Sequence, residues 1–265
     1  MLAGSVAAQQ PVATYTFSVV PQYSPAQLHR EWFPVIERIS RESGIRLELK
    51  IAASIPKFEA EFSRGVPDFA YMNPYHAVMA KHAQGYLPLL RDNKPLSGIL
   101  LVRRDSAYKS IQDLNGRVIG FPAPNSFGAS LYMRALLTES FRISFEPRYL
   151  NTHSNVFRHV AQGSIAAGGG VNLTFDNETL EIREQLRVLY QTPGVAAHPL
   201  VAHPRVPVRV RDLVADAFMA LQRDESGREL LKEIRTPQPA RADYRRDYLP
   251  LELLKVQKFV VPEKD

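Results

Sequence analysis

The first eighty residues alternate between strand and helix patterns, and this alternation restricts the fold more than any other feature of the sequence. Residues 15–20 and 45–51 alternate between apolar and polar side chains, which predicts strands, and the apolar run 67–72 predicts a third. Amphipathic helices are expected over 26–43, 55–64 and 75–82. This order predicts an α/β fold with a mostly parallel sheet flanked by helices, whose ligand-binding loops lie at the carboxyl ends of the strands.

Polar and aromatic side chains follow each of these three strands. Ser54 and Asn73 can each cap a helix and leave exposed amides beyond it. The hydroxyl-bearing aromatic residues in the same loops are Tyr23, Tyr71 and Tyr75. A single aromatic residue at the end of a strand is more often part of the core, but three at one edge favour a binding cleft.

A strand, a turn with two prolines and a helix start follow one another over 118–137. Asn125 and Ser126 supply N-cap residues after the apolar strand 118–121. The first turn of a helix leaves backbone N–H groups without partners at the positive end of the macrodipole, and Gly128 would let an anion come close. We therefore predict an oxyanion site at residues 126–130. The alternative is an ordinary capped helix after a strand.

Composition limits the possible partners. The chain has 265 residues and a net charge of +6, but its Lys and Arg residues are dispersed among 27 acidic residues. Nucleic acid is therefore not expected as a partner, and a mildly cationic protein that attracts small anions fits equally well. The length suits one large domain or two ordinary ones. The absence of cysteine excludes disulfides and thiolate metal sites.

Residues 1–14 are expected to lie outside the fold, as the remnant of an export signal or as a disordered terminus. Residues 2–5 resemble the end of a bacterial lipoprotein signal with Ser5 in place of the lipidated cysteine, and residues 6–8 resemble a small-residue cleavage site. Either interpretation implies export to the periplasm, and the first also implies a lipid anchor on the native precursor. The alternative is a cloning remnant or an arbitrary alanine-rich terminus.

Several later segments resemble one family in the same order. An apolar strand ends in Val-Arg-Arg-Asp-Ser at 102–106, residues 111–120 form an Ile-x-Asp-Leu-x-Gly-Arg-Val-Ile-Gly pattern, and Pro-Asn-Ser follows at 124–126. Further matches lie at 67–77, 152–156, 160–168 and 192–201. Together they resemble the phosphate-, phosphite- and phosphonate-binding proteins among the solute-binding proteins of bacterial ABC importers. The resemblance covers roughly 15–256.

This resemblance implies a two-lobed periplasmic-binding-protein fold, in which each lobe is a mostly parallel sheet flanked by helices. The first lobe would be discontinuous, with residues 15–96 and 206–265, and the second would span 103–197. Residues 97–103 and 198–204 would be the crossover, or hinge, strands. Residue patterns independently predict a helical region over 207–233 and a terminal element over 242–255 that packs against the first lobe.

In this family a tetrahedral oxyanion is held between the lobes. Ser126 matches the family's serine at the helix start, whereas Phe127 and Gly128 stand where threonine and serine usually offer hydroxyl groups. This departure makes backbone N–H groups the expected contacts, and Ser130 could replace one hydroxyl. His153 matches the family's histidine near the ligand. The candidate ligand-binding residues are Ser126, Phe127, Gly128, Ser130, Asn125, His153, Tyr75, Tyr71, Ser54, Tyr23, His198 and Asn172.

Two departures from the family pattern concern charge. Members that bind aminoalkylphosphonates hold the ammonium group with two carboxylates, but the segment around Asn172 has no acid and His198 replaces an aspartate. Because a buried ammonium without a carboxylate partner is costly, aminoethylphosphonate should be a poor ligand. Phosphate, phosphite or a small alkylphosphonate fits better. His198 could donate to that ligand or simply lie in a hinge strand.

The sequence contains no recognisable catalytic, nucleotide-binding or zinc motif, so we expect neither an enzyme nor a cofactor or metal. The glycine run 168–170 lacks the spacing of a nucleotide loop. The expected function is extracytoplasmic capture of a small oxyanion by hinge closure and its delivery to an ABC transporter permease. The alternatives are a ligand-sensing subunit that feeds a sensor kinase and, less readily, an enzyme that acts on a small phosphorylated compound.

Overall fold

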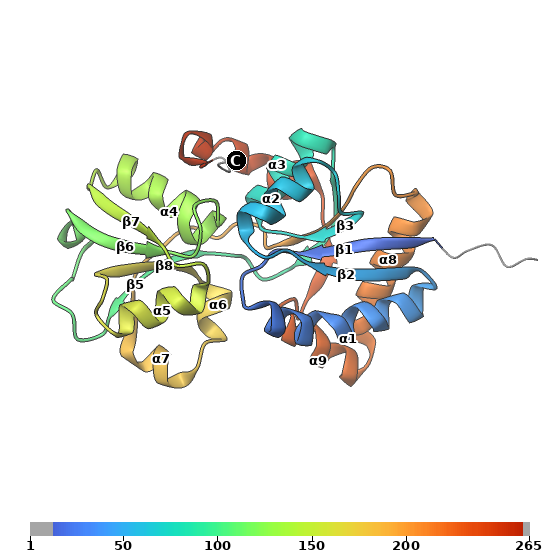
Figure 1. Cartoon of the computed structure of the whole chain (residues 1–265), viewed down its shortest axis with the longest axis horizontal. Coiled ribbons are helices and arrows are strands. Elements are labelled where there is room, and N and C mark those ends of the chain that lie inside the picture. Colours follow the sequence, from blue (N-terminus) through green and yellow to red (C-terminus); the bar gives the residue numbers. More distant parts are fainter. Residues whose placement is uncertain (1–12, 262–265) are drawn as a thin grey trace, which may run out of the picture.

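The computed structural model describes residues 13–261, which form two β-sheets side by side (Figure 1). The first sheet has six strands in the order β11-β4-β10-β3-β1-β2. Its strands are β1 (Thr14–Val19), β2 (Arg46–Ile51), β3 (Phe69–Tyr71), β4 (Leu87–Asp92), β10 (Pro199–Ala202) and β11 (Pro239–Arg241). We call this sheet with its helices the first lobe. The proposed export signal at the N-terminus lies outside the described residues.

The second sheet has five strands in the order β7-β6-β8-β5-β9 and forms the second lobe with its helices. Its strands are β5 (Gly98–Arg103), β6 (Arg117–Phe121), β7 (Phe145–Tyr149), β8 (Ala167–Val171) and β9 (Leu186–Gln191). In both sheets the strands of the βα units pair in parallel, but β10 is antiparallel to β3 and β4, and β5 is antiparallel to β8 and β9. The sheets are therefore mixed, because the strand that enters each lobe from the other one runs against its neighbours.

The chain crosses between the sheets twice, over 93–97 and 192–198. Leu96 and Val195 pair there, with both N–H···O distances at 2.9 Å. The ranges 97–103 and 198–204, expected as crossover strands, instead lie largely within the sheets as β5 and β10. Both ranges are apolar and extended, and such a pattern does not tell a crossing strand from a central one.

Helices cover the first lobe as the sequence patterns predict. The longest, α1 (Pro25–Ser43), is capped by Ser24, whose side chain accepts from the Gln27 amide, and ends at Gly44 in the left-handed region. Its buried face carries the apolar residues Leu28, Trp32, Val35, Ile36 and Ile39. The other main helices of this lobe are α2 (Ile55–Ser63), α3 (Pro74–Gln84), α8 (Val208–Ala220) and α9 (Glu225–Glu233). The helical region predicted over 207–233 is thus confirmed.

In the second lobe, the helix after β6 lies unusually close to its sheet. It consists of the π-helical turn η2 (Phe127–Leu131), α4 (Tyr132–Ala135) and a second π-helical turn, η3 (Leu136–Ser140). A Cβ at Gly169 would lie 1.9 Å from the Ala129 carbonyl oxygen, and one at Gly98 would lie 2.3 Å from the Gly128 carbonyl oxygen. The glycine run of β8 therefore permits close helix–sheet contact. The remaining helices are α5 (His153–Ala161), α6 (Asn172–Asp176) and α7 (Leu180–Gln185).

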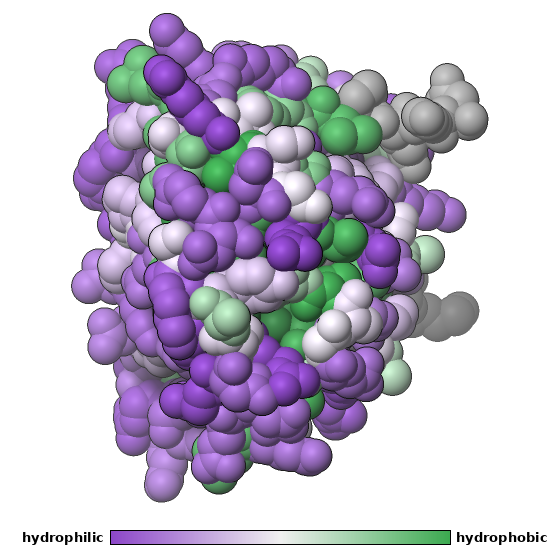
Figure 2. All heavy atoms as spheres, turned by 90° about the vertical axis from the view of Figure 1, so that its left-hand side faces the viewer, coloured by the Kyte–Doolittle hydropathy of each residue, from purple (hydrophilic) through white to green (hydrophobic). Residues whose placement is uncertain are grey.

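One apolar cluster joins the two lobes. Phe127, Leu131 and Leu173 of the second lobe belong to the same buried cluster as the core of the first lobe. Two smaller clusters form the rest of the second lobe's core. The outer end of the second lobe is covered mainly by hydrophilic side chains, with apolar atoms in the hollows between them (Figure 2). Among the described helices, none combines the length and apolar character needed to cross a bilayer.

The C-terminal segment lies across both lobes. After η5 (Tyr244–Tyr248) and α10 (Leu249–Glu252) on the first lobe, the turn η6 (Val256–Phe259) contacts α4 of the second lobe (Figure 1). Arg134 donates to the Phe259 carbonyl at 2.7 Å. This segment forms a third connection between the lobes.

Candidate ligand-binding site

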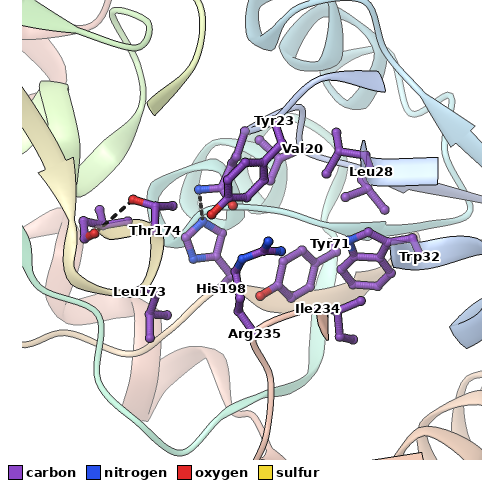
Figure 3. Close-up of a pocket in the computed structure, with 13 residues that line it drawn as sticks. Val20, Tyr23, Leu28, Trp32, Tyr71, Leu173, Thr174, His198, Ile234 and Arg235 are labelled. Atoms are coloured by element: carbon purple, nitrogen blue, oxygen red, sulfur yellow. Dashed lines mark hydrogen bonds between the residues drawn. The ribbon is translucent and has the colours of Figure 1, made fainter. Parts of the chain in front are cut away.

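A small cavity lies where the two lobes meet (Figure 3). Its free volume is about 20 Å³, which is room for about one water molecule. The second lobe contributes only Val171, Leu173 and Thr174. The first lobe contributes Val19, Val20, Gln22, Tyr23, Leu28, Trp32, Tyr71, His198, Ile234 and Arg235.

Strand ends place these side chains. Tyr23 follows β1, Tyr71 is the last residue of β3, and Thr174 stands in α6 directly after β8. These are carboxyl ends of parallel strands, where the alternating strand and helix pattern predicts ligand-binding loops. His198 directly precedes β10, which is antiparallel to β3, so the amino end of β10 lies beside the carboxyl end of β3.

His198 is a neutral hydrogen-bond donor at this cavity. Its Nε2 lies 3.1 Å from the Gln22 Nε2, an amide nitrogen that can only donate, so the imidazole proton is on Nδ1. Burial, together with the neighbouring His76 and His153, lowers the pKa of His198 to about 3. The ring stacks on Tyr71 with centroids 5.6 Å apart. His198 therefore carries no charge at neutral pH.

Tyr23 brings a second neutral donor. Its hydroxyl is buried and has no hydrogen-bond partner within residues 13–261, and burial raises its pKa to about 12. The guanidinium of Arg235 lies 4.2 Å from the centre of the Tyr23 ring. Arg235 also forms a two-fold ion pair with Glu31, with N···O distances of 2.7 and 2.8 Å. In Figure 3, the heads of Tyr23, Tyr71, His198 and Arg235 converge on one region.

His153 stands one hydrogen bond behind the cavity. The Thr174 hydroxyl donates to the Val171 carbonyl at 2.9 Å and therefore accepts from His153 Nδ1 at 3.2 Å. The buried His153 Nε2 has no partner among the described residues. Burial lowers the pKa of His153 to about 3, so this ring is neutral as well. His153 can act on a ligand through Thr174 without lining the cavity.

The predicted oxyanion site at the helix start is covered in this arrangement, and none of its residues lines the cavity. Phe127 stacks on Tyr75 of the first lobe, with centroids 6.0 Å apart and planes at 12°. The Ser126 carbonyl accepts from the amides of Ser130 and Leu131, and the Ser130 hydroxyl accepts from Arg134. Whether these residues bind a ligand when the lobes separate stays a prediction.

Asn125 connects the lobes through its own hydrogen bonds. Its side-chain amide donates to Glu59 and to the Val261 carbonyl, both at 2.9 Å, and accepts from the Val261 amide at 3.0 Å. Asn73 donates to the Asn125 carbonyl at 3.3 Å, and Glu59 also pairs with His76 at 2.8 Å. Asn125 thus holds the lobes and the C-terminal segment together, away from the cavity.

Two other candidates have local structural roles. Ser54 is exposed and caps α2 by accepting from the Lys57 amide. Asn172 accepts from the Ser97 amide at 3.1 Å and donates to the Pro95 carbonyl at 3.3 Å, which fixes the first crossing segment. Neither lines the cavity. Of the twelve candidates, the cavity thus brings together Tyr23, Tyr71 and His198.

The candidates named from the sequence do not include the other polar and aromatic residues of the cavity. These are Gln22, Trp32, Thr174 and Arg235. Gln22 lies in a loop expected to border the site, and Trp32 was assigned only to the core face of α1. Arg235 follows α9, more than two hundred residues after Tyr23, and no motif surrounds it. Only the three-dimensional contacts show that Arg235 lines the cavity.

Comparison with known proteins decides the family. Residues 17–248 match the family model described as "ABC transporter, phosphonate, periplasmic substrate-binding protein". The chain belongs to this family. It is therefore the extracytoplasmic, substrate-binding component of an ABC transporter, and its partners are a membrane permease and a small-molecule ligand. The family consists of binding proteins and not of enzymes.

Solved structures of such substrate-binding proteins share the fold. A binding-protein component of an ABC phosphonate transporter from Pseudomonas aeruginosa matches with a TM-score of 0.82 and 16% identity, over 94% of this chain and 88% of that one. PhnD1 from Prochlorococcus marinus, in complex with methylphosphonate, matches with a TM-score of 0.84 and 12% identity, over 93% of this chain and 99% of that one. XAC2383 from Xanthomonas citri, bound to chloride, matches with a TM-score of 0.75 and 19% identity, over 93% of this chain and 98% of that one. At these identities the likeness establishes the two-lobed α/β fold.

Proposed function

We propose that this substrate-binding protein captures a small oxyanion, namely phosphate, phosphite or a small alkylphosphonate, in the cavity between its lobes. The observation that carries the proposal is the unpartnered hydroxyl of Tyr23, buried beside the neutral donor His198. A buried donor without a partner costs free energy, which an acceptor oxygen of the ligand would recover. The structure of PhnD1 with methylphosphonate supports this ligand class.

Hinge closure is the proposed mode of capture. The free volume of about 20 Å³ is too small to admit a tetrahedral anion unless the lobes move apart. The crossing segments 93–97 and 192–198 are short and paired at Leu96 and Val195, so they can act as the hinge. An anion that accepts from Tyr23 on one lobe would favour the closed form through its differential affinity if the Thr174 hydroxyl on the other lobe turns its proton from the Val171 carbonyl to the anion.

An ammonium-bearing ligand fits the cavity poorly. No acidic side chain is found among its lining residues, and the nearby Glu31 already pairs with Arg235. Desolvating an ammonium group without a carboxylate partner is costly. We therefore propose that aminoethylphosphonate binds more weakly than methylphosphonate.

Two finer proposals concern what happens outside the cavity. The loaded protein would dock on a permease, and the alternative is a periplasmic sensor kinase, which would use the same ligand site and another surface. Neighbouring genes for a permease and an ATPase, or for a kinase, separate these uses.

A lipid anchor on the native precursor is a further proposal, which mass spectrometry of the natively expressed protein would test. An assay for product released from phosphonate or phosphate esters tests the enzyme alternative.

Calorimetric titration of the purified protein with phosphate, phosphite, methylphosphonate and aminoethylphosphonate tests the proposed ligand. We expect binding of at least one of the first three, and Tyr23→Phe should weaken it about tenfold because one hydrogen bond to a charged acceptor is lost. Ser54→Ala, which removes a hydroxyl away from the cavity, is the matched control. Ser126→Ala tests the helix start separately. If aminoethylphosphonate proves the preferred ligand, or if no oxyanion binds, the proposal is wrong.

A further inference from the structure

The guanidinium of Arg235 has hydrogen-bonding capacity that its protein partners leave unused. Of its five N–H groups, two on Nη1 point to Glu31 and to the Glu233 carbonyl, at 2.7 and 3.0 Å, and one on Nη2 points to Glu31 at 2.8 Å. The buried Nε has no partner within residues 13–261. The Nε–H and the second N–H of Nη2 are therefore free, and these two donors share one edge of the planar group.

This free edge belongs to the cavity region. Arg235 lines the cavity, and its head lies among Tyr23, Tyr71 and His198 in Figure 3. The guanidinium lowers the pKa of the Tyr23 hydroxyl through its charge and as a nearby donor, against the larger, opposite effect of burial, although the two groups do not reach hydrogen-bond geometry. Two buried donors that lack protein partners, Arg235 Nε and Tyr23 Oη, thus come from segments far apart in the sequence to the same place. Paired donors on a planar edge match two oxygens of one anion.

We infer that the free edge of Arg235 binds two oxygens of the ligand, and that Glu31, paired with the opposite edge, restricts the site to an anion with a single negative charge. This inference rests on the proposed function. It names Arg235 as a ligand-binding residue and Glu31 as the residue that sets the charge of the site. The ligand class is a singly charged oxyanion with at least two acceptor oxygens, such as the monoanion of methylphosphonate.

Charge balance explains the restriction. Glu31 and Arg235 cancel each other, and the other titratable groups that line the cavity, Tyr23, Tyr71 and His198, are neutral. The titratable groups that face this cluster from neighbouring elements are Glu178, Asp92, His76 and His153. None of these four lines the cavity. A second negative charge on the ligand would be buried without compensation, which is unfavourable at low local dielectric.

The pH dependence of affinity tests the charge restriction. The second ionisation of a phosphorylated side chain has a pKa of about 6, and that of an alkylphosphonate is higher because carbon withdraws less electron density than an ester oxygen. Titration calorimetry with methylphosphonate from about pH 5 to about pH 9 should therefore show affinity that falls about tenfold for each pH unit above the ligand's second pKa. Methanesulfonate keeps one negative charge over this range and serves as the control anion. An affinity for methylphosphonate that stays constant or rises with pH overturns the restriction.

Variants of the ion pair test the two roles. Glu31→Gln leaves Arg235 with an uncompensated positive charge, so the affinity for methylphosphonate should no longer fall as the pH rises. The double variant Glu31→Gln/Arg235→Gln removes both charges, so it avoids a lone buried charge and should keep a melting temperature close to that of the natural sequence. It should nevertheless bind methylphosphonate about tenfold to a hundredfold more weakly. Arg241→Gln, which loses a surface ion pair with Asp216, is the matched control.

The outcomes separate this inference from the proposed function. If the unaltered protein binds no oxyanion, the proposed function fails. If the unaltered protein binds methylphosphonate and the double variant binds it equally well, only the role of Arg235 is refuted. If the double variant loses affinity but Glu31→Gln keeps the pH dependence of the unaltered protein, the role assigned to Glu31 is wrong.

Discussion

At the residue scale, the two neutral histidines next to the cavity make the fold sensitive to acid. His198 and His153 have pKa values of about 3 in the folded protein, mainly because of burial, against about 6.5 in an unfolded chain. Between these values the unfolded chain binds protons that the folded protein does not. The free energy of unfolding should therefore decrease as the pH falls from about 6.5 towards 3, by about 1.4 kcal/mol per pH unit for each histidine.

Urea unfolding at several pH values between about 4 and 7 measures this slope. His198→Gln should reduce the slope by about 1.4 kcal/mol per pH unit, because one of the two groups no longer titrates. His29→Gln, at an exposed position of α1, is the control and should leave the slope unchanged. A variant His198→Gln with the original slope would show that this histidine is protonated in the folded protein.

Residue identity predicted some site residues and could not predict others. Tyr23 and Tyr71 were candidates because they follow recognisable strands, and strand ends meet at one edge of a sheet, whereas His198 was a candidate through the family resemblance. Gly128 fitted a place for an anion equally well, but a glycine is also needed where two backbones touch, and here Gly98 and Val171 occupy that space. The same residue type serves both purposes, so the sequence does not distinguish them.

At the element scale, the C-terminal segment stabilises the contact between the lobes through Asn125. This side chain makes two hydrogen bonds to the backbone of Val261 and one to the buried carboxylate of Glu59. Asn125→Ala should lower the free energy of unfolding by roughly 2–4 kcal/mol, because several bonds are lost and buried polar groups stay unpaired. Urea unfolding measures this change.

The control for this prediction is Asn115→Ala, which removes one hydrogen bond, from the Ser144 amide at 2.9 Å, at an exposed position. Its effect should be about 1 kcal/mol or less. Equal effects of the two substitutions would mean that the lobes are not held together through Asn125. No sequence pattern indicates this role, because the partners Glu59, Asn125 and Val261 are far apart in the chain.

At the scale of the whole molecule, the expected two-lobed α/β fold is confirmed, and the expected hinge strands overlap with strands of the two sheets. Local periodicity identifies strands and helices well, and the helix expected over 26–43 is found as α1. The partners of a strand depend on distant residues, and periodicity carries no information about them. As a result β5 and β10 were taken for crossover strands, although each pairs with strands on both sides within its sheet.

The central claim is that an oxyanion draws the two lobes together. Since the chain has no cysteine, fluorophores can be attached at two introduced sites, Arg46→Cys on β2 and Glu146→Cys on β7, which are exposed positions on different lobes. Energy transfer between them should change as methylphosphonate is added, with the same midpoint as calorimetric binding. Calorimetric binding without any change in energy transfer would contradict capture by closure of the lobes.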